Sequence, residues 1–392
     1  MVEHQSKIER LIAELCPDGV EFKEIQEIFT IKNGYTPSRA EPRYWNDGDI
    51  PWFRMEDLRE GNRILSDSFQ HITSDAVKGG RLFPASSILI ATSATIGEHA
   101  LVTVPHLSNQ RFTSLTLKHD FKDRLEMKFV HYYCFLLDEW CRSNTTTSSF
   151  ASVDMVGFKR FKIPIPPLEI QNEIVRVLDS FTELETELET ELEARKRQYE
   201  YYRDALLISR EGFEQVFLGD IATIGTGSHD TKDAVMGGDY EFYARGRESL
   251  HLNSFDFDEN AIITAGDGVG VGKVFHFARG KYALHQRAYR IVPNENVDAR
   301  FIYHYLVANF AQYLEQTSVH ASVTSLRRPM FLKYPVSLPP FAEQQRIAFI
   351  LDKFDVLVND ISVGLPAELK VRRQQYEYYR GKLLTFKEYA KS

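Results

Sequence analysis

The sequence has little cysteine and no long apolar run. Its 392 residues include three cysteines, Cys16, Cys134 and Cys141, and no Cys-x-x-Cys pair. This odd, dispersed set fits neither a disulfide framework nor a zinc knuckle, so we expect reduced, buried thiols. No stretch of eighteen or more apolar residues is present, and the first residues are too polar for a secretory signal. We therefore expect a cytoplasmic protein with no membrane partner.

Catalytic signatures are also missing. The sequence contains no Asn-Pro-Pro-Tyr or Asp-Pro-Pro-Tyr methylation signature and no Gly-x-Ser-x-Gly elbow, and its histidines lack zinc-ligand spacing. We therefore predict no catalytic residue, no metal site and no cofactor in this chain.

One glycine-rich segment, residues 266–273, suggests a phosphate-binding loop. However, Asp267 stands where such a loop needs glycine, and Val274 stands where it needs serine or threonine. The dinucleotide-binding pattern G-x-G-x-x-G fails as well, because position 271 is valine. A glycine-rich hairpin that allows close backbone approach fits the segment better. An unrecognised enzyme using this loop remains one alternative.

The net charge of −8 provides no overall attraction to nucleic acid. The negative excess is concentrated in residues 163–210 and 211–335, whereas residues 21–162 are balanced. Local basic surfaces are therefore possible, but strong nonspecific affinity for DNA is not expected from this chain alone.

Two helical segments repeat each other closely. Residues 166–181 (PPLEIQNEIVRVLDSF) align with 339–354 (PPFAEQQRIAFILDKF), and 195–207 (RKRQYEYYRDALL) align with 372–384 (RRQQYEYYRGKLL). Fainter matches precede each copy. They are residues 151–153 with 321–323, and Gln110-Arg111 with Gln286-Arg287. The order is thus globule, helix, globule, helix, which favours an internal pseudo-two-fold repeat.

Each helical segment begins after a Pro-Pro pair and carries apolar residues at helical spacing. These residues are Ile170, Ile174, Val177, Leu178 and Phe181 in the first segment and Ile347, Ile350, Leu351 and Phe354 in the second. Gly364 and Pro366 are expected to interrupt the second helix.

A tandem Thr-Glu-Leu-Glu repeat occupies residues 182–193. It places threonine and leucine at Thr182, Leu184, Thr186, Leu188, Thr190 and Leu192. Leucines four residues apart on one face need a partner helix, and a dimerisation coil between chains is one alternative. Because the second helical segment lies in the same chain, we favour an antiparallel intramolecular coiled coil of roughly 40 residues, or about 60 Å.

We predict a mixed α/β (α+β) fold with two globules separated by this coiled coil. The predicted segments are an N-terminal helical segment at 1–20, a first globule at 21–162, a central helical spacer at 163–210, a second globule at 211–335 and a C-terminal helical spacer at 336–392. Short strands such as 87–91 and 260–264 alternate with turns in the globules. Each globule ends in an aromatic-rich helix, near 128–140 and 300–314.

These features together resemble the specificity subunits of type I restriction-modification enzymes. The resemblance is carried by the two QYEYYR blocks, the Thr-Glu-Leu-Glu tandem, the LPAEL element at 365–369, the LCPDGV segment at 15–20 and the proline-proline openings. It spans nearly the full length, and its specific part is the helical repeats. It implies that each globule is a target recognition domain for one half of a split site in double-stranded DNA. Because the two globules differ in sequence, we expect the half-sites to differ and the target to be asymmetric.

The resemblance also implies the partners. The helices would hold two methyltransferase (modification) subunits and set the gap between the half-sites, and restriction/translocase subunits would join that core. S-adenosylmethionine, ATP and Mg²⁺ would belong to these partners. The rival interpretation is a coiled-coil scaffold that joins two protein-binding globules without DNA recognition.

DNA contacts require Arg, Lys, Asn, Gln, Ser or Thr on exposed loops, with cations or backbone amides near phosphates. The candidates in the first globule are Tyr35, Thr36, Ser38, Arg39, Arg54 beside Trp52, Asn109, Gln110 and Arg111, and the polar run from Thr145 to Ser149 is expected to be exposed. The candidates in the second are Ser228, His229, Arg245, Arg247, Lys273, His285, Gln286, Arg287, His320, Arg327 and Arg328. For any single residue the alternative is a turn residue or a surface charge. Trp52 and Tyr243 are expected at core edges, and His131 and His304 in the core.

Overall fold

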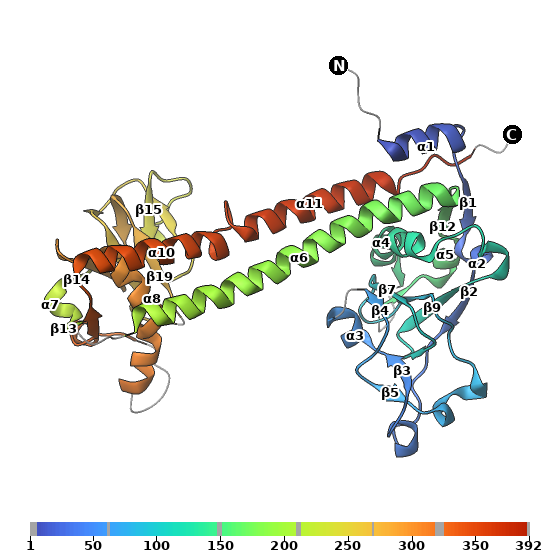
Figure 1. The fold of residues 1–392 in the computed structure, drawn as a ribbon, viewed down its shortest axis with the longest axis horizontal. Coiled ribbons are helices and arrows are strands. Elements are labelled where there is room, and N and C mark those ends of the chain that lie inside the picture. Colours follow the sequence, from blue (N-terminus) through green and yellow to red (C-terminus); the bar gives the residue numbers. More distant parts are fainter. Residues whose placement is uncertain are drawn as a thin grey trace. The chain divides into compact units, whose positions relative to one another are not determined.

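The computed structural model describes residues 6–60, 63–146, 151–208, 213–268, 270–317 and 325–389. The chain divides into two compact units, whose elements are labelled in Figure 1. Unit 1 comprises Met1–Glu185 and Arg372–Ser392, and unit 2 comprises Thr186–Val371. Each unit therefore holds one globule together with helical segments from both copies of the repeat, which confirms the mixed α/β fold class with two globules.

Unit 1 is built around a five-stranded sheet of order β2-β9-β6-β7-β4 and a three-stranded sheet of order β5-β3-β8. The strands of these sheets are β2 (Phe29–Asn33), β3 (Ile50–Phe53), β4 (Ile64–Leu65), β5 (His71–Ile72), β6 (Ser87–Ala91), β7 (His99–Val102), β8 (Leu107–Ser108) and β9 (Phe112–Leu117). The remaining elements are α1 (Lys7–Leu15), β1 (Glu21–Glu24), α2 (Ile25–Ile28), α3 (Met55–Glu60), α4 (Met127–Ser143), β10 (Thr145–Thr146), β11 (Ser152–Val153), α5 (Met155–Arg160) and β12 (Lys162–Ile165).

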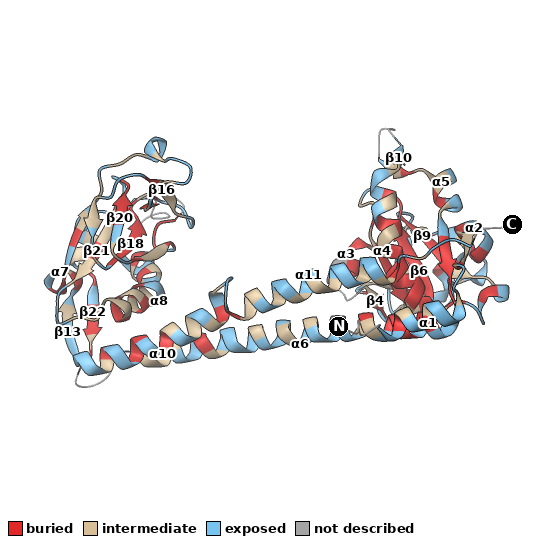
Figure 2. Ribbon diagram, turned by 90° about the horizontal axis from the view of Figure 1, so that it is seen from above, coloured by how far each residue is buried: buried red, intermediate tan, exposed pale blue. Residues whose placement is uncertain are grey.

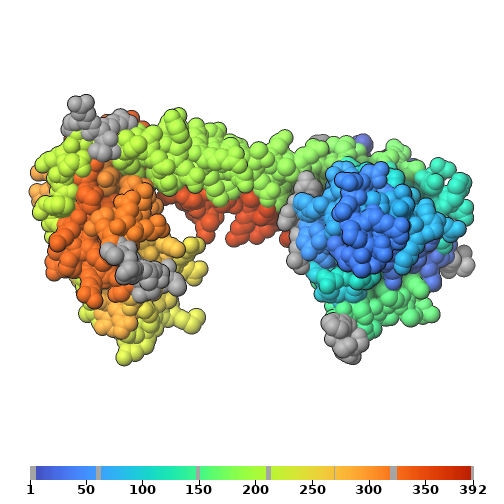
Figure 3. All heavy atoms as spheres, turned by 90° about the horizontal axis from the view of Figure 1, so that it is seen from below, coloured from blue at the N-terminus to red at the C-terminus, as the bar shows by residue number. Residues whose placement is uncertain are grey.

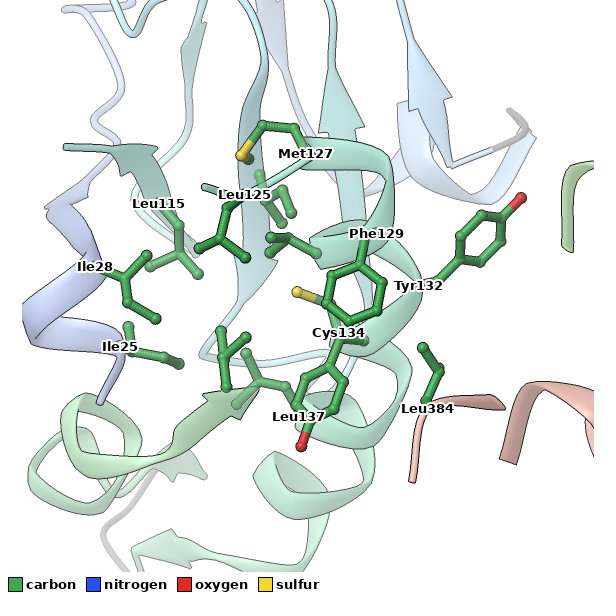
Figure 4. Packing of buried hydrophobic residues seen from close by; sticks show 14 of the residues in the cluster. Ile25, Ile28, Leu115, Leu125, Met127, Phe129, Tyr132, Cys134, Leu137 and Leu384 are labelled. Atoms are coloured by element: carbon green, nitrogen blue, oxygen red, sulfur yellow. The ribbon is translucent and has the colours of Figure 1, made fainter. Parts of the chain in front are cut away.

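One hydrophobic core of unit 1 lies between the larger sheet and α4, and a second surrounds Trp52 and Phe53 of β3. Every residue of β6 is buried, as its short apolar run predicts. Figure 4 shows Leu115 from β9, Ile28 from α2 and Phe129 from α4 converging on this core, and Leu384 joins it from the C-terminal part of unit 1. The aromatic-rich helix predicted near 128–140 is thus a core helix because one of its faces covers the sheet.

The cysteines follow the same division between core and surface. Cys134 and Cys141 on α4 are buried, and burial raises the pKa of the Cys141 thiol to about 12. Cys16, at the end of α1, is only half-buried. The prediction of free thiols is confirmed for all three residues, but the prediction of burial is wrong for Cys16, because the helix it ends covers the core with Ile8 and Leu11.

Unit 2 has a similar topology, with two four-stranded sheets where unit 1 has a five-stranded and a three-stranded sheet. Its sheets have the orders β14-β21-β18-β19 and β16-β15-β20-β17. The strands are β14 (Ala222–Thr226), β15 (Tyr240–Tyr243), β16 (Leu250–Leu252), β17 (Phe257–Asp258), β18 (Ala261–Ala265), β19 (Phe275–Ala278), β20 (Lys281–Leu284) and β21 (Ala288–Pro293). The other elements are β13 (Glu214–Phe217), α7 (Leu218–Ile221), α8 (Ala299–Thr317), α9 (Arg328–Leu332), β22 (Pro335–Leu338), α10 (Phe341–Asn359) and α11 (Leu365–Leu383), which continues into unit 1.

The correspondence between the two units is detailed. In unit 1, β3 pairs parallel with β8, and in unit 2 β15 pairs parallel with β20. The antiparallel pair β1/β12 joins the first and last strands of the globule in unit 1, and β13/β22 does the same in unit 2. The internal repeat expected from the helices therefore extends through both globules, although their sequences share little.

The two long helical segments differ in continuity. Helix α6 (Leu168–Leu207) runs unbroken for 40 residues, and Ile170, Ile174 and Leu178 in its first turns are buried. Along its middle, half-buried and exposed residues alternate (Figure 2). The second segment is interrupted between α10 and α11, at the predicted Gly364. A Cβ at Gly364 would lie 2.3 Å from the carbonyl oxygen of Val356, so the chain can turn this tightly only with glycine.

The Thr-Glu-Leu-Glu leucines do not share one buried face. Leu188 and Leu192 are half-buried, whereas Leu184 is exposed and Phe181 and Glu185 are half-buried instead. Residues four apart advance ~40° around a helix with 3.6 residues per turn, so a spacing of four alone drifts off any straight seam. The prediction of one leucine face is therefore wrong at Leu184.

Each QYEYYR block contacts a phenylalanine from the other copy of the repeat, at the end of the segment that begins with Pro-Pro. In unit 1, Phe181 stacks on Tyr379 with ring centroids 5.5 Å apart, and in unit 2 Phe354 stacks on Tyr202 at 5.6 Å. Arg373 donates to Glu185 at 2.6 Å in unit 1. Because higher numbers on α6 meet lower numbers on α11, the two helices run antiparallel in this unit.

The proline-proline blocks are repeated because each one anchors a globule. Gln171 accepts a hydrogen bond from the Glu126 backbone at 2.8 Å and donates to the carbonyl oxygens of Arg124 and Pro166. Its counterpart Gln344 accepts from the Asp298 backbone at 2.8 Å. Both glutamines are buried, so each satisfies part-buried backbone groups at the start of α4 or α8 from inside the protein.

A matching pair of aspartates completes these anchors. Asp179 accepts hydrogen bonds from Lys128 at 2.8 Å and from Tyr132 at 2.7 Å. Asp352 accepts from Arg300 and from His304, the latter at 2.7 Å, and these partners occupy the equivalent positions on α8. His304 and His131 are both buried, as predicted.

Replacing Gln171 with alanine should lower the free energy of unfolding of unit 1 by about 2–4 kcal/mol, because buried backbone groups lose their partners. All three tryptophans, Trp45, Trp52 and Trp140, lie in unit 1, so urea unfolding followed by tryptophan fluorescence reports on this unit. The exposed neighbour Asn172 provides the control substitution to alanine. Equal shifts for the two variants would contradict the anchoring role.

Candidate nucleic-acid interface

In unit 1, three loops leave the larger sheet at the same edge. The end of β2 pairs with the start of β9 at Asn33 and Thr113, and the end of β6 pairs with β9 at Ala91 and Phe112. The loops at 34–49, 92–98 and 109–111 therefore begin or end side by side, and we call this the loop edge of unit 1. It carries most of the residues that the sequence analysis selected in the first globule.

The loops of this edge are bonded to each other. The Tyr35 backbone donates to the Ser108 carbonyl oxygen at 2.8 Å, and Thr36 donates to the Gln110 side chain at 2.6 Å. The Tyr35 hydroxyl donates to the Ala76 carbonyl oxygen at 3.1 Å and accepts from the Lys78 backbone at 2.7 Å. Tyr35 is thus half-buried and holds the loop in place rather than presenting a free side chain.

The charged residues of this edge differ in freedom. Arg39 is exposed and lies 3.9 Å above the ring of Trp45, and Ser38 beside it is exposed as well. Arg54, which follows β3 and lies outside this edge, is half-buried, and its Nε lies 3.8 Å from Glu56. Trp52 is buried, as expected of a core edge, and donates from Nε1 to the Tyr35 carbonyl oxygen.

Asn109, Gln110 and Arg111 form a tight turn between β8 and β9. The side-chain oxygen of Asn109 accepts from the Arg111 backbone at 3.0 Å, which leaves the Arg111 side chain exposed. Of the polar run from Thr145 to Ser149, Thr145 and Thr146 are exposed in β10, and the rest lies outside the described residues.

Unit 2 has an equivalent loop edge. Thr226 pairs with Tyr289, and Ala265 with Ala288, so the loops at 227–239, 266–274 and 285–287 meet as in unit 1. Arg287 donates from its backbone to Nδ1 of His285 at 2.9 Å, which matches the bond from Arg111 to Asn109. The faint alignment of Gln110-Arg111 with Gln286-Arg287 is therefore confirmed as a structural equivalence.

Several predicted residues are exposed on or near this second edge. They are Ser228, Arg245, Arg247, Lys273, Gln286, Arg287, Arg327 and Arg328. His229 is half-buried and lies 3.1 Å from Asp256, and Gln286 donates to Asp230 at 3.2 Å. Tyr243 is half-buried, as a core-edge residue should be. His320 and residues 321–323 lie outside the described residues.

His285 does not fit its predicted role. It is buried and stacks on Phe242, and burial lowers the pKa of its imidazole. A buried ring that accepts a backbone hydrogen bond cannot reach a base. His285 therefore shapes the turn before Arg287, and its selection as a DNA contact is corrected.

The glycine-rich segment connects two antiparallel strands, β18 and β19, which confirms the hairpin interpretation. Asp267 within it forms ion pairs with Arg245 at 2.9 Å and Arg287 at 3.1 Å. Sequence reasoning used Asp267 only as evidence against a phosphate loop. Nothing in the local sequence relates it to arginines 20 or more residues away, so only the strand register could have identified the pairing.

The described residues contain no group of three or more His, Cys, Asp or Glu side chains that could hold a metal ion. None of the described helices is both long and apolar enough to cross a membrane.

The chain matches the family model of the type I restriction modification DNA specificity domain over residues 17–195 and 210–371. It is 44% identical over 368 residues to the type I restriction enzyme EcoprrI specificity subunit of Escherichia coli, covering 88% of this chain and 90% of the relative. It is also 34% identical over 295 residues to the EcoR124I/EcoR124II specificity subunit of Escherichia coli, covering 66% and 71%.

The fold is shared with solved structures. The crystal structure of the type I restriction-modification S subunit from M. genitalium superposes with a TM-score of 0.61 at 15% identity, covering 93% of this chain and 96% of that one. The resemblance carried by the helical repeats is confirmed, and the protein belongs to the specificity subunits of type I restriction-modification enzymes.

Proposed function

We propose that each unit reads one half of a split site in double-stranded DNA through its loop edge. The observation that carries this proposal is that the two edges share one backbone frame and present different side chains. Ser93 in unit 1 is replaced by Asp267 in unit 2, and each forms the same isolated β-bridge from the loop after β6 or β18. Because the same frame offers different donors and acceptors, the two half-sites differ and the target is asymmetric.

The exposed arginines supply the second support. Arg39 and Arg111 in unit 1 and Arg287 in unit 2 present guanidinium groups on loops that rigid sheets position. Guanidinium forks suit both guanine edges and phosphates, and this local positive charge offsets the negative charge of the whole chain. The scaffold alternative has no comparable observation in its favour.

The helices are proposed to dock two methyltransferase subunits and to act as one antiparallel coiled coil. Tyr201 and Tyr378 occupy the same position in the two QYEYYR blocks and are 70% and 66% exposed. Ile361 and Val363 between α10 and α11 are exposed too, and side chains of α6 form a surface strip in Figure 3. Exposed aromatic and apolar residues at two equivalent places fit two equivalent partners.

Catalysis is proposed to lie in the partner subunits. The methyl donor S-adenosylmethionine, ATP and Mg²⁺ would be bound there, with restriction/translocase subunits joining the core in the cytoplasm. This division rests on membership of the specificity-subunit family.

Methylome sequencing of a host that expresses this chain with its modification subunits tests the proposal. We expect one asymmetric motif of two short specific blocks separated by a fixed gap, and co-purification of two modification subunits per chain. A gel shift should show sequence-specific binding only with those subunits present. A continuous motif, or no motif in a host that contains the assembled complex, would contradict it.

A further inference from the structure

An aspartate lies between two arginines on the loop edge of unit 2. One oxygen of Asp267 accepts from Nη1 of Arg245 at 2.9 Å, and the other accepts from Nη1 of Arg287 at 3.1 Å. The Asp267 side chain is 24% exposed, whereas the Arg287 side chain is 62% exposed. Burial by itself would raise the pKa of Asp267, but hydrogen bonds and charge from Arg245 and Arg287 lower it overall. The carboxylate is therefore ionised and shared by both guanidinium groups.

The backbone around this group is fixed by three loops. Gly266 donates to the Arg287 carbonyl oxygen at 2.8 Å, and Asp267 forms an isolated bridge with Ser325. The Arg287 backbone is itself held by the buried His285 at 2.9 Å. An exposed arginine normally samples many rotamers, and ordering it costs free energy on binding. Asp267 removes much of that cost before any ligand arrives.

We propose that Asp267 is a positioning residue that aims Arg245 and Arg287 at guanine in the major groove, so that the half-site of unit 2 contains guanine. This inference rests on the proposed function. Within the described residues, each guanidinium donates from one Nη to Asp267, which leaves further N–H groups for a ligand. Guanine offers two acceptors, O6 and N7, which an arginine fork matches, whereas adenine places a donor at N6.

Unit 1 provides an internal comparison. Thr92 donates to the Arg111 carbonyl oxygen at 3.0 Å, as Gly266 does to Arg287, and Ser93 bridges Ser152 as Asp267 bridges Ser325. The position of Asp267 is thus occupied by Ser93, which carries no charge. Arg111 has the same backbone frame as Arg287 but no carboxylate from this position.

The test uses the chain assembled with its modification subunits and a duplex library in which both half-sites are randomised. For Asp267→Asn we expect discrimination for guanine at one or two positions of one half-site to fall roughly tenfold or more, since the arginine forks are no longer held in place for a bidentate contact. Arg287→Lys, which keeps the charge, should relax the same half-site, and Arg111→Lys should relax only the other. The reciprocal variant Ser93→Asp should sharpen the guanine preference next to Arg111.

Glu259→Gln is the matched control. It removes the same charge from a different ion pair of unit 2, in which Glu259 lies 2.6 Å from Arg290. Glu259 precedes β18, whereas Asp267 follows it on the loop edge. We expect the wild-type motif from this variant.

Three results would overturn the inference. In the first, Asp267→Asn weakens binding to all sequences equally, which indicates phosphate contacts. In the second, the variant loses its preference at a base other than guanine. In the third, Asp267→Asn and Arg287→Lys both keep the wild-type motif. A failure of the proposed function itself is read separately, because the wild-type complex would then select no split motif from the library.

Discussion

Deleting residues 186–189, one Thr-Glu-Leu-Glu unit, should move modification from the original target to a site with a shorter gap between unchanged half-sites. Helix α6 is continuous through these residues, so the deletion shortens it by about 6 Å and turns it by ~400°, a net ~40°. A shift of ~6 Å spans nearly two base pairs at ~3.4 Å each, which turn B-form DNA by roughly 60°. The recognition unit therefore shifts along the duplex and stays within about 20° of its angular phase.

The loss on the original target should be large, because a shifted unit cannot contact its half-site. We expect modification of the old site to fall by at least on the order of a hundredfold, given the ratio of specific to nonspecific affinity in such proteins. Long-read methylome sequencing measures both sites at once. The control replaces Thr186, Glu187 and Glu189 with alanine and keeps the length, and it should retain the original gap. An unchanged motif after the deletion would refute the spacer role of the repeat.

Replacing Gly227 with alanine should abolish recognition by unit 2. A Cβ at this position would lie 1.9 Å from the carbonyl oxygen of Leu284, closer than any real contact. The loop must therefore move away, which breaks the bond from the His229 backbone to Leu284 at 3.3 Å and that from Gln286 to His229 at 2.9 Å. Because these bonds hold the loop edge together, we expect affinity for one half-site to fall by on the order of a hundredfold.

Gly34→Ala should have the same effect on the other half-site, since its Cβ would lie 2.2 Å from the Asn109 carbonyl oxygen. Gly246→Ala is the control, because the nearest atom to its Cβ is 3.7 Å away. Binding is measured for the assembled complex on duplexes in which one half-site at a time is scrambled. Wild-type affinity of the Gly227 variant for both half-sites would show that the close approach of the loops does not matter.

Much of the fold followed from local patterns. The apolar runs at 87–91 and 260–264 became β6 and β18, and the aromatic stretches became α4 and α8 because each covers its sheet. Gly364, which was expected with Pro366 to interrupt the second helix, lies between α10 and α11. Leu184 was misjudged because a spacing of four residues looks like a helical face but does not stay on one.

The candidate site was only partly predictable. Loop residues such as Arg111 and Arg287 were selected by residue type, and both are exposed at equivalent places. His285 has the same kind of sequence context as its exposed neighbours, yet its ring is buried. A turn residue points inward or outward according to the strands that flank it, and sequence alone does not reveal that choice.

The duplicated plan, the helical repeats and the family can be read from the chain alone, because they depend on patterns within a few helical turns and on comparison of the sequence with itself. Which distant groups meet depends on the folded chain: Gln171 contacts the start of α4, Phe181 contacts Tyr379, and Asp267 contacts two arginines. These contacts join residues separated by 20 to about 200 positions. They depend on strand register and on helix phase, which cannot be read from any single segment of the chain.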